Sequence, residues 1–235
     1  WALAGTPADV AKRLTDAATW SKIKTEMQVM LAERGFTDLA WATVATYRAD
    51  PSLNGLTMKQ VAQKLKGADT ADAQLDAARD MQLAGGASMV YHFMSDDDVK
   101  AIMKHPFVSI ASDAGLNTLG QGVPHPRGYG DNPRVLGKYV RDEKVITLED
   151  AVRKMTSLPA QFFGFADRGV IKSGAFADLV IFNPATVGDT ATYEQPHAYP
   201  NGIANVLVNG VVTVDHGKHT GVRAGVIVTK NRAKS

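Results

Sequence analysis

In the first hundred residues, apolar side chains recur every three or four positions, which is typical of amphipathic helices. The residues TPAD at positions 6–9 supply a helix cap, a proline at the first helical position and an acid in the first turn. We expect a helix from Thr6 that Gly35 ends and that the Asp16–Trp20 region could divide in two. Further helices are expected around Met58–Leu65, Leu75–Met81 and Ser95–Met103, and short strands at Trp41–Tyr47 and Ala87–Met94.

The middle of the chain changes from a periodic to a glycine-rich pattern. Phe107–Ala111 is a short apolar run with β-branched residues, and it predicts a buried strand. Asp113 follows it directly, and a buried carboxylate is stable only when it is paired, protonated or bound to a metal. The residues from there to Arg134 include five glycines and several cationic side chains. This composition predicts an irregular active-site loop.

The last third of the chain predicts two short helices followed by a small β unit. Thr147 is expected to cap the first helix, and Ser157 begins a second that Gly164 closes. From Gly169 onward, short valine-rich runs alternate with turn residues, and Asn209-Gly210 is a strong hairpin signal. The expected strands are Asp178–Phe182, Ile203–Val208, Val211–Val214 and Val222–Val228. Such a small sheet is expected to pack on a further part of the protein.

Composition and charge exclude several classes of protein. The net charge is +2 and the cationic residues are scattered, so the chain is not expected to bind nucleic acid. No apolar run approaches the roughly 20 residues of a membrane span. The absence of cysteine fits a reducing or an oxidising compartment; we expect a cytoplasmic protein, with a periplasmic or secreted one as the alternative. Because residue 1 is Trp1 without a signal peptide after it, the chain is expected to be a processed product or a fragment.

The residues themselves leave three interpretations of Asp113 open. A phosphate-binding loop is disfavoured, because GLNTLGQG is followed by neither Lys-Ser nor Lys-Thr and lacks GxGxxG spacing. A structural aspartate that caps a local turn is the simplest alternative. The third is a carboxylate that carries a proton or neighbours a metal. No GxSxG motif is present, which argues against a serine hydrolase.

A series of motifs decides among these interpretations by resemblance. They are, in chain order, SDAG after an apolar run, HPRGYG, PRVLGKYVRD, LEDAVRKMTSLPA, DRGVIKSGAFADLVIFNP and VLVNG. In this order they resemble the C-terminal half of the N-acyl-D-amino-acid deacylase (D-aminoacylase) family, within the amidohydrolase superfamily. The resemblance implies an α/β fold, with residues 1–165 as the C-terminal part of a metal-dependent (β/α)8 barrel carrying a helical insertion. Residues 166–235 would then be a segment of a small β-sandwich.

The resemblance also implies roles for individual residues in the hydrolysis of N-acyl-D-amino acids. Asp113 matches the aspartate at the end of the eighth barrel strand, which contacts a site for one or two zinc ions and carries a proton. Arg127 matches a position that grips the α-carboxylate of the substrate, for which a guanidinium fork is suited. His125 is expected to position that arginine. Tyr129 and Arg134 are further candidates for substrate binding, with a structural role as the alternative for each.

The chain departs from the family pattern in its histidines. The family's His-x-His and its two single histidine ligands have no counterparts among the six histidines of this sequence, which are His92, His105, His125, His197, His216 and His219. One carboxylate cannot hold a catalytic zinc, which usually has three protein ligands. The chain is therefore expected to be inactive by itself. An N-terminal chain of the same precursor or gene would supply the remaining ligands and form a heterodimer with it.

Two alternatives to this function stay open. One is another amidohydrolase reaction, such as hydrolysis of a cyclic amide or a carbamate, against which the carboxylate clamp argues. The other is a non-catalytic subunit that has kept the fold.

Overall fold

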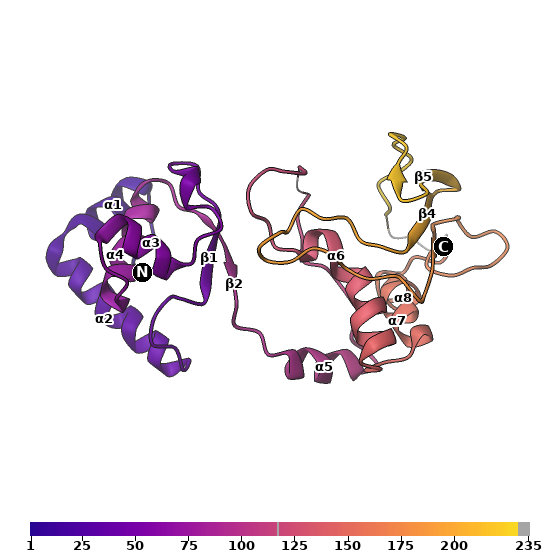
Figure 1. Ribbon diagram of the computed structural model, residues 1–235, viewed down its shortest axis with the longest axis horizontal. Coiled ribbons are helices and arrows are strands. Elements are labelled where there is room, and N and C mark those ends of the chain that lie inside the picture. The colour runs from indigo at the N-terminus through magenta and orange to yellow at the C-terminus, as the bar shows by residue number, and fades with distance from the viewer. Residues whose placement is uncertain (117, 230–235) are drawn as a thin grey trace, which may run out of the picture. The chain divides into compact units, whose positions relative to one another are not determined.

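The computed structural model describes residues 1–116 and 118–229, which form two compact units (Figure 1). The N-terminal unit contains residues 1–93 and 120–125, and the C-terminal unit contains residues 94–116, 118–119 and 126–229. Within these described ranges, no helix has the length and apolar character needed to cross a membrane.

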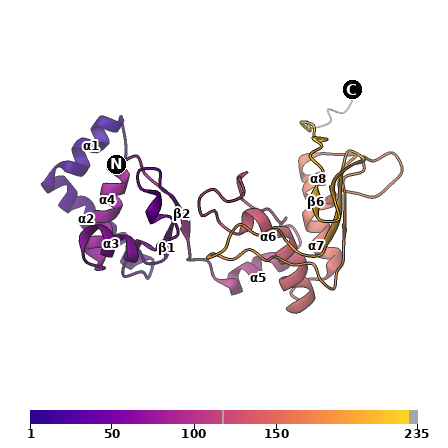
Figure 2. The same ribbon diagram turned by 45° about the horizontal axis from the view of Figure 1, so that its top comes forward.

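The N-terminal unit packs helices beside a two-stranded antiparallel sheet (Figure 2). Its elements are α1 (Pro7–Thr15), α2 (Ala17–Glu33), β1 (Ala42–Thr46), the 3-10 turn η1 (Pro51–Leu53), α3 (Met58–Lys66), α4 (Ala71–Leu83) and β2 (Ser88–Tyr91). Val44 of β1, Val61 of α3 and Leu53 of η1 are fully buried in one apolar cluster. Burial of this shared face is the main force that stabilises the unit.

Local signals in the sequence set where these helices begin and end. Thr6 and Asp9 form a reciprocal capping box at the start of α1. Asp16 closes α1 and its carboxylate then accepts a hydrogen bond from Thr19 N at 2.8 Å, which begins α2. The expected division of the first helix near Asp16 is thereby confirmed, and so are the strands predicted around β1 and β2.

The C-terminal unit begins with helices that surround a second apolar cluster. They are α5 (Asp96–Lys104), α6 (Arg127–Arg134), the π-helix η2 (Val135–Asp142), α7 (Leu148–Met155) and α8 (Ser157–Phe163). Met103 of α5, Leu136 and Tyr139 of η2 and Ala151 of α7 meet in this cluster. Thr147 caps α7 and Gly164 closes α8 in the left-handed conformation, as predicted.

Charged side chains connect α5 to η2. The carboxylate of Asp96 lies 2.7 Å from Lys100 Nζ and 2.8 Å from Lys138 Nζ, and it also accepts a hydrogen bond from the Tyr139 hydroxyl at 2.8 Å. These hydrogen bonds, that of Lys100 first, hold the pKa of Asp96 well below its usual range. Both lysines also pair with Glu143. The two helices therefore share one network of alternating charges.

An antiparallel sheet follows, with the strand order β3-β4-β5-β6. The strands are β3 (Leu179–Phe182), β4 (Ile203–Val208), β5 (Val211–Asp215) and β6 (Lys218–His219). Asn209 and Gly210 join β4 to β5 with φ angles of 51° and 80°, the left-handed pair that a tight two-residue hairpin requires. Phe182 and Ile203 pack against the helical cluster and so attach the sheet to it.

Two glycines allow the rod formed by α6 and η2 to pack closely against residues 187–189, which lie between β3 and β4. A Cβ atom on Gly130 would lie 2.6 Å from Asp189 Cβ, and one on Gly137 would lie 2.7 Å from Val187 O. The two glycines are seven residues apart, about two helical turns, and so share one face of the rod. The rod and the 187–189 backbone therefore approach more closely than any larger residue permits.

The structure corrects three expectations about elements. Phe107–Ala111 is not a strand; it is irregular, and Phe107 is 81% exposed. A strand needs the main-chain hydrogen bonds of a neighbouring strand, whereas Ile110 N donates to Lys154 O of α7 instead. Val222–Val228 is likewise irregular. Residues 127–134, expected to be a loop, form α6.

The helix α6 was missed because its residues are poor helix formers by themselves. It contains two glycines and Pro133, which lacks the N–H that an α-helix needs at that position. The wider π-helix η2 follows two residues later, at Val135. The barrel, the sandwich and the domain boundary after residue 165 stay predictions.

Close packing at Gly202 gives a stability prediction with an internal control. Gly202 and Gly210 have similar φ angles of 77° and 80°, so alanine at either site carries about the same backbone strain, roughly 1–2 kcal/mol. A Cβ on Gly202 would lie 2.5 Å from Val187 Cα, whereas one on Gly210 meets nothing within 4 Å. We expect Gly202→Ala to lower the free energy of unfolding by about 1–3 kcal/mol more than Gly210→Ala does. Equal losses in denaturant unfolding would contradict the close packing.

Candidate functional site

Asp113 and Arg127, the two residues expected to carry the chemistry, meet in the C-terminal unit. Arg127 Nη2 lies 2.8 Å from Asp113 Oδ2. Asp113 has a φ angle of 49°, in the left-handed region that aspartate tolerates better than most residues. Its side chain is 88% exposed, and an ion pair this open to water contributes little stability. The ion pair therefore does little to stabilise the fold, but it shows that the two side chains lie close together.

Arg127 is held by the first turn of α6. Pro126 precedes the helix, and its carbonyl accepts hydrogen bonds from Tyr129 N and Gly130 N. The other end of α6 is fixed by Arg134, whose guanidinium lies 2.9 Å from the carboxylate of Asp189. Arg127 therefore stands at the start of a short helix whose other end is anchored by an ion pair.

Asp131, one helical turn after Arg127, was not predicted from the sequence. Its Oδ2 atom is buried and has no hydrogen-bond partner in the structure. Burial raises the pKa of Asp131, and the positive charge of Arg127 partly opposes that rise. The i, i+4 spacing of a basic and an acidic residue was the available signal, but it has meaning only in a helix, which was not expected here.

Tyr129 and Arg134 both contact other residues of the C-terminal unit. The Tyr129 hydroxyl lies 3.0 Å from Nδ1 of His197, and its ring packs edge-on against Tyr199. Burial raises the pKa of Tyr129. Arg134 pairs with Asp189 in the same way. Both residues connect α6 to the 189–199 segment, which favours the structural alternative for each, and their proposed contact with substrate stays a prediction.

His125 belongs to the N-terminal unit, together with residues 120–124. The main chain there is attached by a hydrogen bond from Val123 N to Ala45 O of β1, at 2.8 Å. The expected role of His125 beside Arg127 stays a prediction.

The described residues do not complete a metal site. In residues 1–116 and 118–229, no three histidine, aspartate or glutamate side chains are placed to hold one ion. Asp113 is thus a single candidate ligand, and a catalytic zinc usually needs three from the protein. The zinc implied by the resemblance does not fit these residues by themselves.

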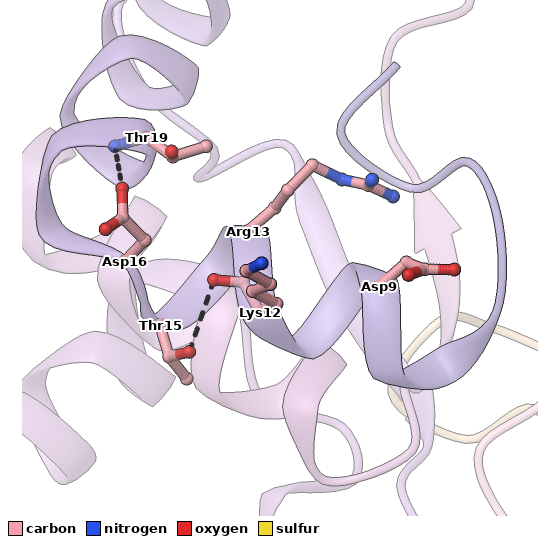
Figure 3. Close-up of a pocket in the computed structure, with 6 residues that line it drawn as sticks. All are labelled: Asp9, Lys12, Arg13, Thr15, Asp16 and Thr19. Carbon is pink, nitrogen blue, oxygen red and sulfur yellow. Dashed lines mark hydrogen bonds between the residues drawn. The ribbon is translucent and has the colours of Figure 1, made fainter.

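A surface depression beside α1 and α2 includes two helix-capping acids in its lining (Figure 3). It is lined by charged and hydroxyl side chains, namely Asp9, Lys12, Arg13, Thr15, Asp16 and Thr19. As Figure 3 shows, Asp16 is engaged with the main chain of Thr19. Asp9 is likewise engaged in the cap of α1. Hydrogen bonding of this kind, first from Thr6 to Asp9 and from Thr19 to Asp16, lowers the pKa of both acids. These groups stabilise helix ends.

Comparison with known proteins places the chain in a family. The model of the amidohydrolase family matches residues 15–214, which include Asp113, Arg127 and α6. The chain belongs to the amidohydrolase family. The Alcaligenes xylosoxydans xylosoxydans D-aminoacylase is 40% identical over 196 residues, which are 83% of this chain and 38% of that protein. This amidohydrolase chain thus spans well under half the length of that relative.

Solved structures agree with the family assignment. A structure of D-aminoacylase described by its binuclear metal center matches with a TM-score of 0.73 and 36% identity, over 82% of this chain and 39% of the other. N-acyl-D-glutamate deacylase from Bordetella bronchiseptica, complexed with zinc and a phosphonate inhibitor, matches with a TM-score of 0.67 and 34% identity. That match covers 83% of this chain and 42% of the other. The fold is thus that of an α/β metal-dependent amidohydrolase, of which this chain shows a part.

The buried carboxylate of Asp131 gives a pH-dependent prediction. Its folded-state pKa is raised above the unfolded value, about 3.9, so stability falls as the pH rises through the folded-state pKa. Asp131→Asn removes the buried charge. We therefore expect a higher thermal midpoint than in the parent protein at pH 7, and a difference that shrinks as the pH approaches about 4.

Asp142→Asn is the matched control, because hydrogen bonding to Arg141 lowers the pKa of Asp142. Its loss should not stabilise the protein at pH 7. A stability difference for Asp131→Asn that does not change with pH would show that charge burial is not its cause.

Proposed function

We propose that this chain is part of a zinc-dependent hydrolase that cleaves the amide bond of N-acyl-D-amino acids. The observation that carries the proposal is the meeting of Asp113 and Arg127 in a chain 40% identical to a D-aminoacylase. In an N-acyl amino acid, the carboxylate and the scissile amide nitrogen are attached to the same carbon. A proton carrier and a carboxylate clamp for such a substrate must therefore lie close together, as these two side chains do.

In this proposal Arg127 recognises the substrate and exchanges partners to do so. Its guanidinium forms a planar fork that suits two parallel hydrogen bonds to a carboxylate. In the structure, one arm of that fork, Nη2, contacts Oδ2 of the exposed Asp113 carboxylate. Arrival of the substrate's α-carboxylate would replace Asp113 there, and the carboxylate oxygens of Asp113 would then be available for the reaction.

Asp113 would then move the proton. A carboxylate at this position can accept a proton from the attacking water at Oδ2 and return it to the departing amine nitrogen. Zinc is proposed as the cofactor because a similar D-aminoacylase structure is described by its binuclear metal center and a similar N-acyl-D-glutamate deacylase structure contains zinc. Asp113 is the ligand that this chain would contribute. We propose that the remaining ligands are on an N-terminal polypeptide of the same precursor or gene.

Replacement of Asp113 tests the proton-carrier role. In the complete enzyme, Asp113→Asn should lower kcat at least roughly 10²-fold, the scale of general acid–base catalysis, because an amide cannot accept the proton. Steady-state kinetics and zinc content are measured together, so that loss of metal is not mistaken for loss of chemistry. Asp97→Asn, at another exposed acid of the same unit, should have near-normal kcat. Near-normal turnover by Asp113→Asn would refute the assignment.

Replacement of Arg127 tests the clamp separately. Arg127→Lys keeps the charge but loses the fork, so kcat/KM should fall by at least about 10-fold for free-acid substrates and change little for their carboxamide analogues. Arg168→Lys is the matched control, because Arg168 also pairs with an aspartate, Asp178, and has no proposed role in substrate binding. It should affect acids and carboxamides equally. Equal losses on both substrates for Arg127→Lys would identify Arg127 as structural too.

A further inference from the structure

Lys154, near the end of α7, is a fully buried cation that contacts the main chain leading to Asp113. Its side chain has no exposed surface. Nζ donates hydrogen bonds to His105 O and, at 3.1 Å, to Val108 O. The main-chain carbonyl of Lys154 accepts a hydrogen bond from Ile110 N at 3.1 Å. One residue of α7 thus binds three successive points of the 105–110 segment.

A buried ammonium is an expensive way to fill space in an apolar core. Lys154 is near Ala151 of the helical cluster on the same helix, where a methionine or leucine would pack without a desolvation cost. The nearest carboxylate oxygen, Asp150 Oδ2, is 3.8 Å from Nζ, so the ammonium is satisfied mainly by main-chain carbonyls. We explain the burial of the Lys154 ammonium by the two main-chain carbonyls that it binds, those of His105 and Val108.

Those groups have no strand to hold them. The 105–110 segment is irregular; Lys154 binds three of its main-chain groups, and Arg153 binds the carbonyl of Pro106. Asp113 comes only three residues after Ile110, a distance of at most about 10 Å along an extended chain. The contacts of Lys154 at His105, Val108 and Ile110 are therefore the anchor from which the chain reaches Asp113.

We propose that Lys154 is a positioning residue for Asp113, acting through the carbonyls of His105 and Val108. The proposal rests on the proposed function, in which Asp113 carries the proton. Lys154 itself touches neither substrate nor the reacting atoms. Its effect is on the place that the carboxylate occupies, and a displacement of about 1 Å at a reacting group can lower the rate by about 10²-fold.

Lys154→Met in the complete enzyme tests this, because methionine has a similar length but no donor. We expect kcat to fall about 10- to 100-fold while KM changes less than about 3-fold and the zinc content stays at that of the parent. The deciding measurement is a double-mutant cycle. In the Asp113→Asn background, Lys154→Met should lower kcat by less than about 3-fold, because the carboxylate that Lys154 positions is already gone.

Arg153→Gln is the matched control. Arg153 donates to the neighbouring carbonyl of Pro106 at 2.9 Å, but its side chain is 38% exposed, so water can replace that hydrogen bond. It should change kcat less than about 2-fold. Lys154→Gln, which keeps one donor group, provides the same comparison if Lys154→Met does not fold. Loss of folded, zinc-loaded enzyme in both variants would show that Lys154 supports the whole fold, and would overturn the proposal.

The outcomes distinguish this inference from the proposed function. If Asp113→Asn lowers kcat strongly but Lys154→Met leaves kcat near normal, or lowers it equally in both backgrounds, the positioning role is wrong and the proposed function stands. If Asp113→Asn itself has near-normal kcat, the proposed role of Asp113 fails first, and the positioning role fails with it.

Discussion

The close approach of the α6–η2 rod to the 187–189 backbone is the constraint on which the C-terminal unit depends. Gly130 and Gly137 remove two side chains from one face of the rod, and Asp189 and the main chain of Val187 fill that space. Arg134 then pairs with Asp189 across the same contact. Arg127, at the start of the rod, inherits its position from this packing. A site residue that is itself exposed is thus held by contacts that are buried.

The η2 half of the rod is held by charge as well as by close packing. The lysines Lys100 and Lys138 alternate with Asp96 and Glu143, so each charge has two partners of opposite sign. Single pairs at a surface contribute little, but a network in which every member is shared resists the loss of any one contact. The rod is therefore fixed along its length by two kinds of interaction that respond differently to salt.

Local chemistry explains which parts of this fold the sequence predicted. The caps at Thr6 and Thr147 and the turn at Asn209-Gly210 act within a few residues, so they can be recognised without the fold. The helix α6 cannot, because its glycines and Pro133 disfavour helix locally and its support comes from residues more than 50 positions later. At Phe107–Ala111 a strand was predicted where none forms. Apolar β-branched residues favour a strand, but a strand also needs a neighbouring strand to pair with.

The same division applies to the candidate site. Asp113 and Arg127 were both singled out from the sequence, and the structure brings their side chains together, although their roles stay predictions. Asp131 and Lys154 escaped notice because burial is what makes them informative, and burial is a property of the assembled chain. Residue type and spacing identify groups that can react; the groups that hold them in place are identified by packing.

The path of the chain between the two units affects how such a protein can evolve. Residues 94–116 and 118–119 belong to the C-terminal unit, residues 120–125 belong to the N-terminal unit, and the C-terminal unit resumes at Pro126. Neither unit is a single continuous stretch, so recombination at one boundary cannot exchange either of them intact. Residues 120–125, the six that belong to the N-terminal unit, lie between Asp113 and Arg127 in the sequence. The two units, and the pair of residues on either side of that segment, are therefore inherited together.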